Sequence, residues 1–400
     1  MITWRHWLMV MTLALSANAA VAQLVSEITM EKVRYAVGEP IYVRFTLTNV
    51  GKEPEQFMVG SAYSMCSGHS IQVSRGRPLQ HSSCDTGVSG SCISGQRVVG
   101  PGESYADTVL VNYEHDLSEP GSYAIQALQV VRYGPKTDEI VHQANGPEVR
   151  EERVFEIVVV GGNEAEQVVN LQPYVSQLNS KDEETRMEAA RVIASTAPKS
   201  MEDTLVAMLK IPAAHGLALE GLRRINTEKA RAALAEIVKN TKEYSWDKER
   251  AIRFLGEMGD KSYFALLQGV AEATPPNQAR DYVWAAAELG GDDAMPFVME
   301  LLSSKDPFSR GNGVMALPRT GSRSAVPVLI ELLRGGNEDV GVLASNGLIR
   351  ITHRSPFPQQ EWGGAAPGET YGEWKRWWSA EGASAKLYGP GECGEIEALQ

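Results

Sequence analysis

The sequence predicts two folds in series, an antiparallel β-sandwich followed by an α-solenoid of helical hairpins. Apolar residues recur at every second position before about residue 160 and at helical spacing after it. A period of 31 residues runs through the second part, where it links Leu255, Ala286, Leu317 and Leu348. A fixed period of this size is typical of stacked helical hairpins rather than of one closed core.

The composition is that of an ordinary globular chain with an acidic balance. Of the residues, 43% are hydrophobic and 22% are charged, and the formal net charge is −12. This field repels nucleic acid and anionic membranes, so we expect no nucleic-acid partner. The sequence has no HExxH, EF-hand, GxGxxG or phosphate-loop string and no nucleophile elbow. We therefore expect no enzymatic activity and no cofactor.

Residues 1–22 are typical of a secretion signal. Arg5 gives a positive start, an apolar stretch from Trp7 to Ser16 follows, and Ala20 and Ala22 supply small residues before a cleavage point. The apolar stretch is too short to span a bilayer, and no later stretch is long enough. We expect a soluble, exported chain, periplasmic or extracellular, with an uncleaved membrane anchor as the alternative.

The expected sandwich covers residues 23–160. Apolar side chains alternate along residues 41–48, and further strands are predicted at 105–113, 123–131 and 154–160. Clusters of Gly and Pro separate these runs, as turns require. Several short strands at this spacing predict an antiparallel sandwich.

Two strings of this region resemble the immunoglobulin-like modules of exported bacterial proteins. They run from Tyr35 to Asn49 (YAVGEPIYVRFTLTN) and from Pro120 to Ile125 (PGSYAI). The resemblance implies an Ig-like sandwich and implies nothing about function.

The cysteines suit an oxidising compartment, where disulfides form and persist. The disulfide candidates allow three pairings, and they are Cys66, Cys84, Cys92 and Cys393. Together with His69 and His81, the first three also resemble zinc-ligand spacing. A metal-binding or hydrolase accessory that uses the Cys66–Cys92 loop therefore stays as an alternative.

Residues 164–353 are expected to form about six helical hairpins. The second helices of these hairpins are predicted at 182–193, 212–225, 247–258, 277–289, 307–317 and 339–351. Prolines that suit a first helical turn are Pro212, Pro296 and Pro327. Glycines that suit a left-handed residue just past a helix end are Gly259, Gly290, Gly321 and Gly335. Pro318 is expected to end or kink the fifth second helix.

This array resembles the HEAT-repeat family. The residues that carry the resemblance are an Asp at the start of the second helix with an Arg a turn later, as in Asp182/Arg186, Asp247/Arg250 and Asp306/Arg310. The resemblance implies that these residues cap helices and link neighbouring repeats. The last hairpin departs from it, because Leu343 stands where the Arg is expected.

Residues 354–400 are expected to form a cap helix and a tail. Trp374, Trp377 and Trp378 share one face of a short helix, because they lie at positions i, i+3 and i+4. A solenoid end needs a cover, so we expect these side chains to dock on the last repeat. An exposed aromatic face for a partner or a glycan is the alternative.

The predicted function follows from shape. Second helices of such arrays line a concave face that binds peptides or protein surfaces. Several basic residues fall mainly on these helices, and we take them, together with the three tryptophans, as candidate partner-binding residues. They are Arg186, Arg223, Arg224, Lys248, Arg250, Arg253, Arg280 and Arg310. They serve either as caps and solvated faces or as a basic strip for an acidic partner. We predict a non-enzymatic protein-interaction scaffold of the bacterial cell envelope, with a carbohydrate-binding module as the alternative.

Overall fold

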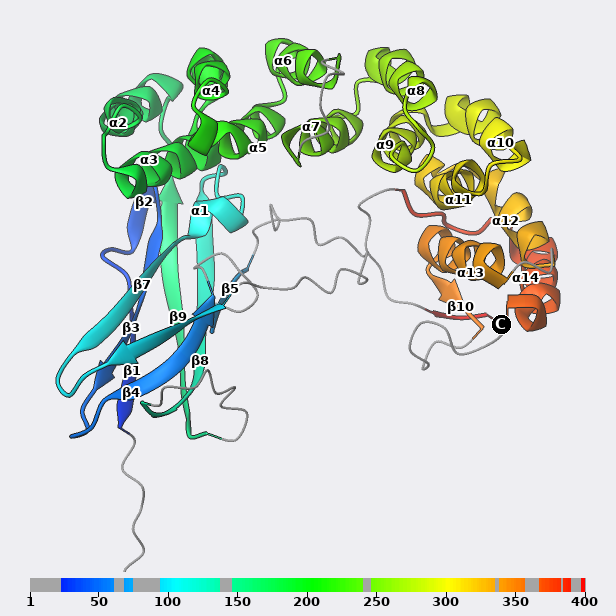
Figure 1. Ribbon diagram of the computed structural model, residues 1–400. Coiled ribbons are helices and arrows are strands. Elements are labelled where there is room, and N and C mark those ends of the chain that lie inside the picture. Colours follow the sequence, from blue (N-terminus) through cyan, green and yellow to red (C-terminus); the bar gives the residue numbers. More distant parts are fainter. Residues whose placement is uncertain are drawn as a thin grey trace, which may run out of the picture.

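The computed structural model describes residues 23–60, 68–74, 94–136, 146–239, 246–334, 338–356, 367–382, 384–389 and 397–399. Sheets form the N-terminal part and helices form an arc that covers the rest of the chain (Figure 1). The predicted signal, the four cysteines and His81 lie outside the described residues, so the predictions made on them stay predictions.

The described strands form two sheets in the N-terminal part. The first sheet has the order β1-β3-β7, and the second has the order β2-β9-β8-β4-β6 with β5 also paired to β8. The bounds are β1 Leu24–Thr29, β2 Arg34–Ala36, β3 Tyr42–Asn49, β4 Glu55–Gly60, β5 His69–Val73, β6 Ser94–Val99, β7 Ser104–Leu110, β8 Gly121–Pro135 and β9 Glu148–Val160. Neighbours pair antiparallel except β2 and β9, which run parallel.

The predicted alternation is seen most clearly in β3. Val43, Phe45 and Leu47 are at most 1% exposed, whereas Arg44 between them is exposed. Phe45 lies opposite Ile28 of β1, and the inward side chains of both sheets form two apolar clusters, one that includes Phe45 and one that includes Leu47. The period of two thus places one face of β3 in the core and leaves the other face outside.

One expected strand is shorter than predicted. The run at 105–113 ends as a strand at Leu110, and a four-residue helix α1 (Val111–Glu114) follows. The Asn112 side chain explains the turn, because its Oδ1 accepts from the backbone N of Ile41 at 2.7 Å and its Nδ2 donates to the carbonyl of Glu39 at 3.3 Å. A side chain that bonds the neighbouring backbone offers the chain an alternative to the ladder.

The helical arc begins where the sheets end. β9 ends at Val160, and Asn163 caps the next helix in a capping box with Glu166. The helices of the arc are α2 Glu164–Gln177, α3 Glu183–Thr196, α4 Glu202–Met208, α5 His215–Ile225, α6 Glu228–Lys239, α7 Trp246–Glu257, α8 Phe264–Ala273, α9 Arg280–Gly290, α10 Met295–Ser303, α11 Pro307–Ala316, α12 Ala325–Leu333 and α13 Glu338–Thr352. Among the described residues, 3₁₀ turns lie between these helices at Lys199–Met201, Pro212–Ala214, Lys261–Tyr263, Gly291–Ala294 and Leu317–Thr320.

The odd-numbered helices from α3 to α13 lie on the inner side of the arc and the even-numbered ones on the outer side (Figure 1). We call the former the inner helices. They are the second helices of the predicted hairpins, and consecutive inner helices pack on one another. The 31-residue period therefore corresponds to one outer and one inner helix.

Helix ends fall largely where glycine and proline predict them. Gly259 and Gly321 have φ of 75° and 60°, and α11 ends at Ala316 just before Pro318. The expectation for Gly290 needs a correction, because the left-handed residue is Gly291, with φ of 59°. A Cβ on Gly290 would lie 2.8 Å from the Phe264 ring, so this position requires glycine for a close approach instead. Gly335 lies outside the described residues.

The C-terminal part packs on the last two helices of the arc. Helix α14 (Pro367–Glu381) packs on α12 and α13, and two short strands, β10 (Arg354–Ser355) and β11 (Glu397–Ala398), pair in parallel. Within the described ranges, no helix combines the length and the apolar character that a membrane crossing needs.

Candidate functional site

The candidate residues on the inner helices fall into groups with different contacts. The first group belongs to a repeated loop-to-helix motif. Asp182 caps α3 by accepting from the backbone N of Thr185 at 2.8 Å, while Arg186 donates to the carbonyl of Ser180 at 2.7 Å. The two hydrogen bonds to the Asp182 carboxylate from Thr185 lower the pKa of that carboxyl.

The same motif returns 124 residues later, which is four periods of 31. Asp306 accepts from the backbone N of Ser309 at 2.8 Å, and Arg310 donates to the carbonyl of Ser304 at 2.9 Å. In both copies the arginine therefore closes the loop before its own helix. Asp182 and Asp306 thus cap their helices, as the resemblance implies, whereas these hydrogen bonds of Arg186 and Arg310 reach their own loop and not the neighbouring repeat that the resemblance also implies.

Arg224 links two inner helices. Its guanidinium donates to the carbonyls of Ala194 at 3.0 Å and Ala197 at 2.6 Å, at the end of α3. Terminal carbonyls of a helix lack partners within the helix and attract positive charge. Burial lowers the pKa of Arg224 to about 10, and the nearby charge of Asp116 opposes that shift. Arg224 thus holds neighbouring repeats together.

In α7, the candidate residue Lys248 is buried and the candidate residue Arg250 is partly buried. Lys248 is 6% exposed, with its ammonium 5.6 Å from the centre of the Tyr282 ring. This changes the expectation for Lys248, because a buried side chain offers a partner almost no surface. The Arg250 guanidinium lies against Gly216 of α5. Asp247 is not a cap at this position but lies within α7, where its carboxylate is 2.8 Å from Nδ1 of His215.

Arg223 and Arg253 share one carboxylate. Arg223 of α5 lies 3.9 Å and Arg253 of α7 lies 3.6 Å from the Glu257 carboxylate. Both guanidinium groups also lie over the ring of Phe254, at 5.1 and 5.2 Å. The Arg253 side chain is 50% exposed. The inner face is therefore charge-paired at this point, with Arg253 reaching solvent.

An aromatic side chain of α9 lies between two arginines. The centre of the partly exposed Trp284 ring is 5.1 Å from the guanidinium of Arg280 and 4.0 Å from that of Arg319. Arg319 also approaches Glu288 at 3.7 Å, and Arg280 is 54% exposed on its side chain. Cation–π contact of this kind fixes both the ring and the charges. We call Trp284, Arg280 and Arg319 the tryptophan–arginine cluster.

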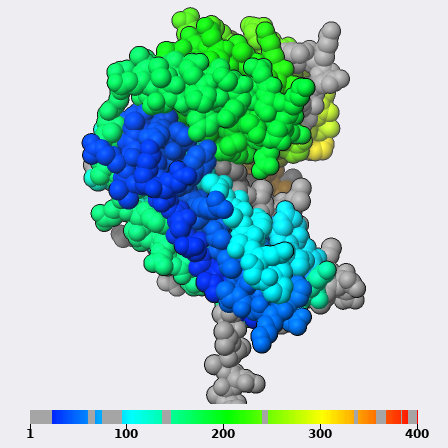
Figure 2. All heavy atoms as spheres, turned by 90° about the vertical axis from the view of Figure 1, so that its left-hand side faces the viewer, coloured from blue at the N-terminus to red at the C-terminus, as the bar shows by residue number. Residues whose placement is uncertain are grey.

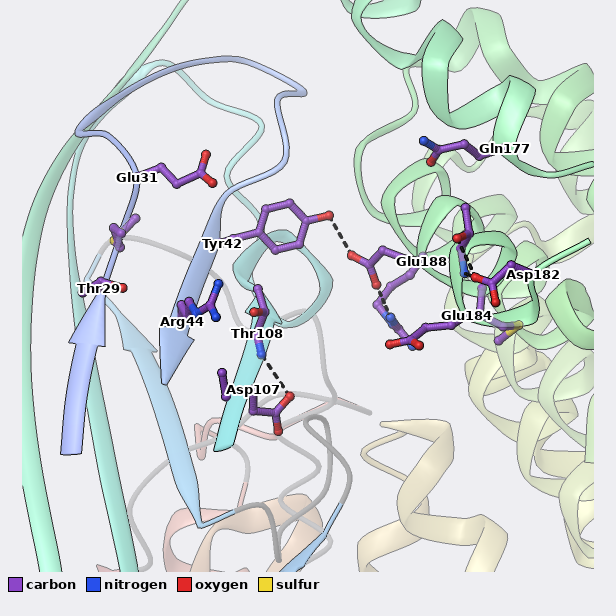
Figure 3. A pocket seen from close by; sticks show the side chains of 15 residues that line it. Thr29, Glu31, Tyr42, Arg44, Asp107, Thr108, Gln177, Asp182, Glu184 and Glu188 are labelled. Atoms are coloured by element: carbon purple, nitrogen blue, oxygen red, sulfur yellow. Dashed lines mark hydrogen bonds and ion pairs between the residues drawn. The ribbon is translucent and has the colours of Figure 1, made fainter. Parts of the chain in front are cut away.

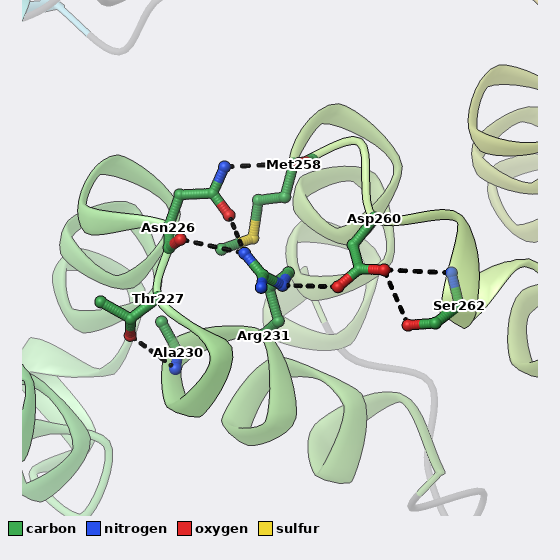
Figure 4. Close-up of polar contacts among 7 residues, drawn as sticks. All are labelled: Asn226, Thr227, Ala230, Arg231, Met258, Asp260 and Ser262. Carbon is green, nitrogen blue, oxygen red and sulfur yellow. Dashed lines mark hydrogen bonds and ion pairs between the residues drawn. The ribbon is translucent and has the colours of Figure 1, made fainter.

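Sequence reasoning missed a link between the loops of neighbouring repeats (Figure 4). Asn226 adopts a left-handed conformation at the end of α5, with φ of 46°, and donates to the carbonyl of Met258 at 3.3 Å. Arg231 donates to Asn226 and pairs with Asp260 at 2.9 Å. Asp260 in turn caps the next turn by accepting from Ser262. Asn at a left-handed helix end was the available signal.

The tryptophans of α14 are mostly enclosed. Trp374 and Trp377 are 0% and 2% exposed in the core of the arc, whereas Trp378 is partly exposed and lies 5.8 Å from the guanidinium of Arg323. Arg323 also donates to the carbonyls of Gly382 and Ala385. The alternative of an exposed aromatic face therefore needs a correction, because Trp374 and Trp377 have no surface left for a partner or a glycan.

Helix α3 also meets the sheets. Tyr42 of β3 donates to the Glu188 carboxylate at 2.7 Å, and Arg191 pairs with the same carboxylate. The Arg191 guanidinium lies 5.9 Å from the centre of the Tyr113 ring of α1. Figure 2 shows the N-terminal residues directly beneath the green helices of this end of the arc. These contacts join the two parts of the chain.

A cleft of about 1020 Å³ opens beside this contact (Figure 3), and we call it the junction cleft. One wall is the outward face of β1, β3 and β7, and the other is α2, α3 and the turn before α3. Its charged lining residues are Glu31, Asp107, Asp182, Glu184 and Glu188 against Arg44 and Arg191. Acidic groups therefore outnumber basic ones in the cleft.

Within the sheet part, Glu55 and His115 are buried and Glu114 is partly buried. Desolvation raises the pKa of Glu114, and the charge of the neighbouring His69 partly opposes this rise. Desolvation also raises the pKa of Glu55. Desolvation lowers the pKa of His115, although its Nε2 lies 3.3 Å from the carbonyl of Ile71. His69 itself stacks on Phe45 at 4.5 Å and lies 3.3 Å from Asp107. The described residues contain no group of three or more potential metal ligands.

Comparison with known proteins gives one match to a family. Residues 264–345 match the family model described as HEAT repeats. A comparison with curated protein sequences finds no match.

Solved structures are similar only at low identity. The complex of CpcE and CpcF of phycocyanin lyase from Nostoc sp. PCC7120 is 16% identical with a TM-score of 0.31, over 54% of this chain and 82% of that chain. Salmonella alpha-2-macroglobulin reacted with methylamine is 12% identical with a TM-score of 0.19, over 82% of this chain. The match covers 26% of that longer chain. Residues 264–345, less than half of the chain, are therefore similar to HEAT repeats.

Proposed function

We propose that this chain is a non-enzymatic protein-interaction scaffold of the bacterial cell envelope. In this proposal the helical arc is an α-solenoid over residues 164–353, preceded by an Ig-like β-sandwich over residues 23–160 and followed by a C-terminal cap. The signal-like sequence of residues 1–22 supports export to the periplasm or the cell exterior. HEAT repeats and the side-by-side inner helices support a partner that lies along the inner face.

The observation that carries the proposal is the tryptophan–arginine cluster on the inner side of the arc. Trp and Arg are the residue types most enriched among the residues that dominate binding energy at interfaces. Trp284 is held between Arg280 and Arg319, so little conformational freedom is lost when a partner covers it. Arg253, half exposed one repeat earlier, extends the same surface.

The test is a crosslinked pull-down of native envelope proteins with the full processed chain. Trp284→Ala is expected to lower the yield of the captured partner at least tenfold, because it removes the anchor of the surface. Trp246→Ala is the matched control, since Trp246 is 82% exposed at the start of an inner helix and lies outside the cluster. Equal capture by native chain, variant and control contradicts the proposal.

A further inference from the structure

We propose that the junction cleft binds a short basic peptide segment of a partner protein, at a site distinct from the tryptophan–arginine cluster. The first argument is space. A volume of about 1020 Å³ is at the upper end of the range in which proteins enclose small ligands, so the cleft accommodates several side chains of an extended segment. Its two walls come from the sheets and from the arc, so a segment in the cleft contacts both parts.

The second argument is charge. Within the described part of the chain, Glu31 on the sheet side and Glu184 on the helix side have no hydrogen-bond or ion-pair partner. Figure 3 shows them on opposite walls. Glu188 accepts from Tyr42 and pairs with Arg191, so it joins the two walls rather than offering a free charge. Two exposed carboxylates without a side-chain partner on facing walls favour a positively charged partner.

The third argument is the apolar part of the lining. Met30 comes from the sheet side and Met187 from α3, and both are partly buried. Methionine adapts to irregular partners, and the aliphatic stems of Lys and Arg pack along apolar surface while their charged ends reach acidic groups. Small inorganic cations have no such stems. The lining therefore fits basic side chains of a peptide better than free cations.

The positive charge of Arg44 determines where in the cleft the basic side chains of a peptide can lie. It projects from the outward face of β3 into the cleft and has no hydrogen-bond or ion-pair partner among the described residues. A basic segment meets repulsion at this point, so the positive side chains of the partner lie toward Glu31 and Glu184. Removal of Arg44 is therefore expected to strengthen binding.

The test measures fluorescence anisotropy of a fluorescein-labelled peptide, Arg-Ala-Lys-Arg-Ala-Lys, with the full processed chain. The double substitution Glu31→Gln and Glu184→Gln is expected to raise Kd at least tenfold, and Arg44→Ala is expected to lower it about threefold. The matched control is Glu272→Gln with Glu300→Gln on outer helices, which changes the net charge equally and is expected to change Kd less than twofold.

Three results would overturn the proposal. The first is an equal loss of affinity in the cleft variant and the control variant, which means that only the overall charge of the protein attracts the peptide. The second is the absence of measurable peptide binding to a chain whose circular dichroism shows it to be folded. The third is displacement of the peptide by spermidine as effectively as by unlabelled peptide, which makes the occupant a small polyamine.

Discussion

The sheet part and the helical arc are held together over different distances along the chain. In the sheets, the backbone N of Gln23 donates to the Tyr133 hydroxyl 110 residues away, and Ile41 bonds Asn112 across 71 residues. In the arc, Arg224 reaches back 30 residues to Ala194. The sheets are therefore stabilised by contacts between residues far apart in the sequence. The arc is stabilised by contacts between neighbouring repeats, as in quasi-one-dimensional repeat proteins.

The largest expected effect tests whether damage in the arc stays local. Trp374→Ala removes a side chain that is 0% exposed at the end of the arc and is expected to lower the free energy of unfolding of that end by about 3–5 kcal/mol. Hydrogen exchange should accelerate in α12, α13 and α14 while protection of β3 and β8 is unchanged. Trp246→Ala serves as the control, with a change within about 0.5 kcal/mol. Uniform loss of protection across both parts contradicts the comparison.

A smaller effect tests the links between repeats. Arg224→Met keeps an aliphatic side chain of similar length but leaves the carbonyls of Ala194 and Ala197 without this donor. We expect a loss of about 1–3 kcal/mol in the free energy of unfolding, measured by urea denaturation. Arg376→Met, on an exposed side chain of α14, is expected to cost less than about 0.5 kcal/mol. If both variants cost the same, the carbonyl contacts of Arg224 are not what joins α3 to α5.

The smallest effect concerns the sheets and depends on pH. Desolvation raises the pKa of Glu55 above the ordinary value of 4.5 in the folded chain, so folding favours its protonated form. The stability that this group contributes is present below that value and is lost as pH rises through the folded pKa. Glu55→Gln is therefore expected to gain stability over the native chain as pH rises from about 4 to 7 in thermal denaturation. A stability difference that does not change with pH would remove Glu55 as its cause.

Much of the arc could be predicted because its signals are local. The apolar period, the prolines and the glycines each act within one or two turns of helix, and α5, α9 and α11 lie close to their predicted ranges. The prediction of a left-handed conformation at Gly290, where Gly291 adopts it instead, shows the limit of this reasoning. Gly291 has the positive φ, while Gly290 lies against the Phe264 ring of a neighbouring helix, a contact that the local sequence does not reveal.

The candidate residues were harder to assign, because their roles depend on contacts between repeats. Arg224, Lys248 and Arg253 all read as basic residues on one face, yet one bonds carbonyls, one is buried and one is half exposed. The junction cleft is less predictable still. It exists only where a sheet face that includes Arg44 meets a helix that includes Glu184, and 140 residues of sequence separate them.

The link from Arg231 to Asp260 has a mechanical consequence. It ties one interhelical loop to the next, and ion pairs between Lys261 and Asp293 and between Arg319 and Glu288 join further neighbours along the arc. Connections of this kind resist shear between adjacent repeats but do not brace distant ones. Small rotations between adjacent repeats therefore add up along the arc. We expect the C-terminal end of the arc to move relative to the sheets by more than any two neighbouring repeats move relative to each other.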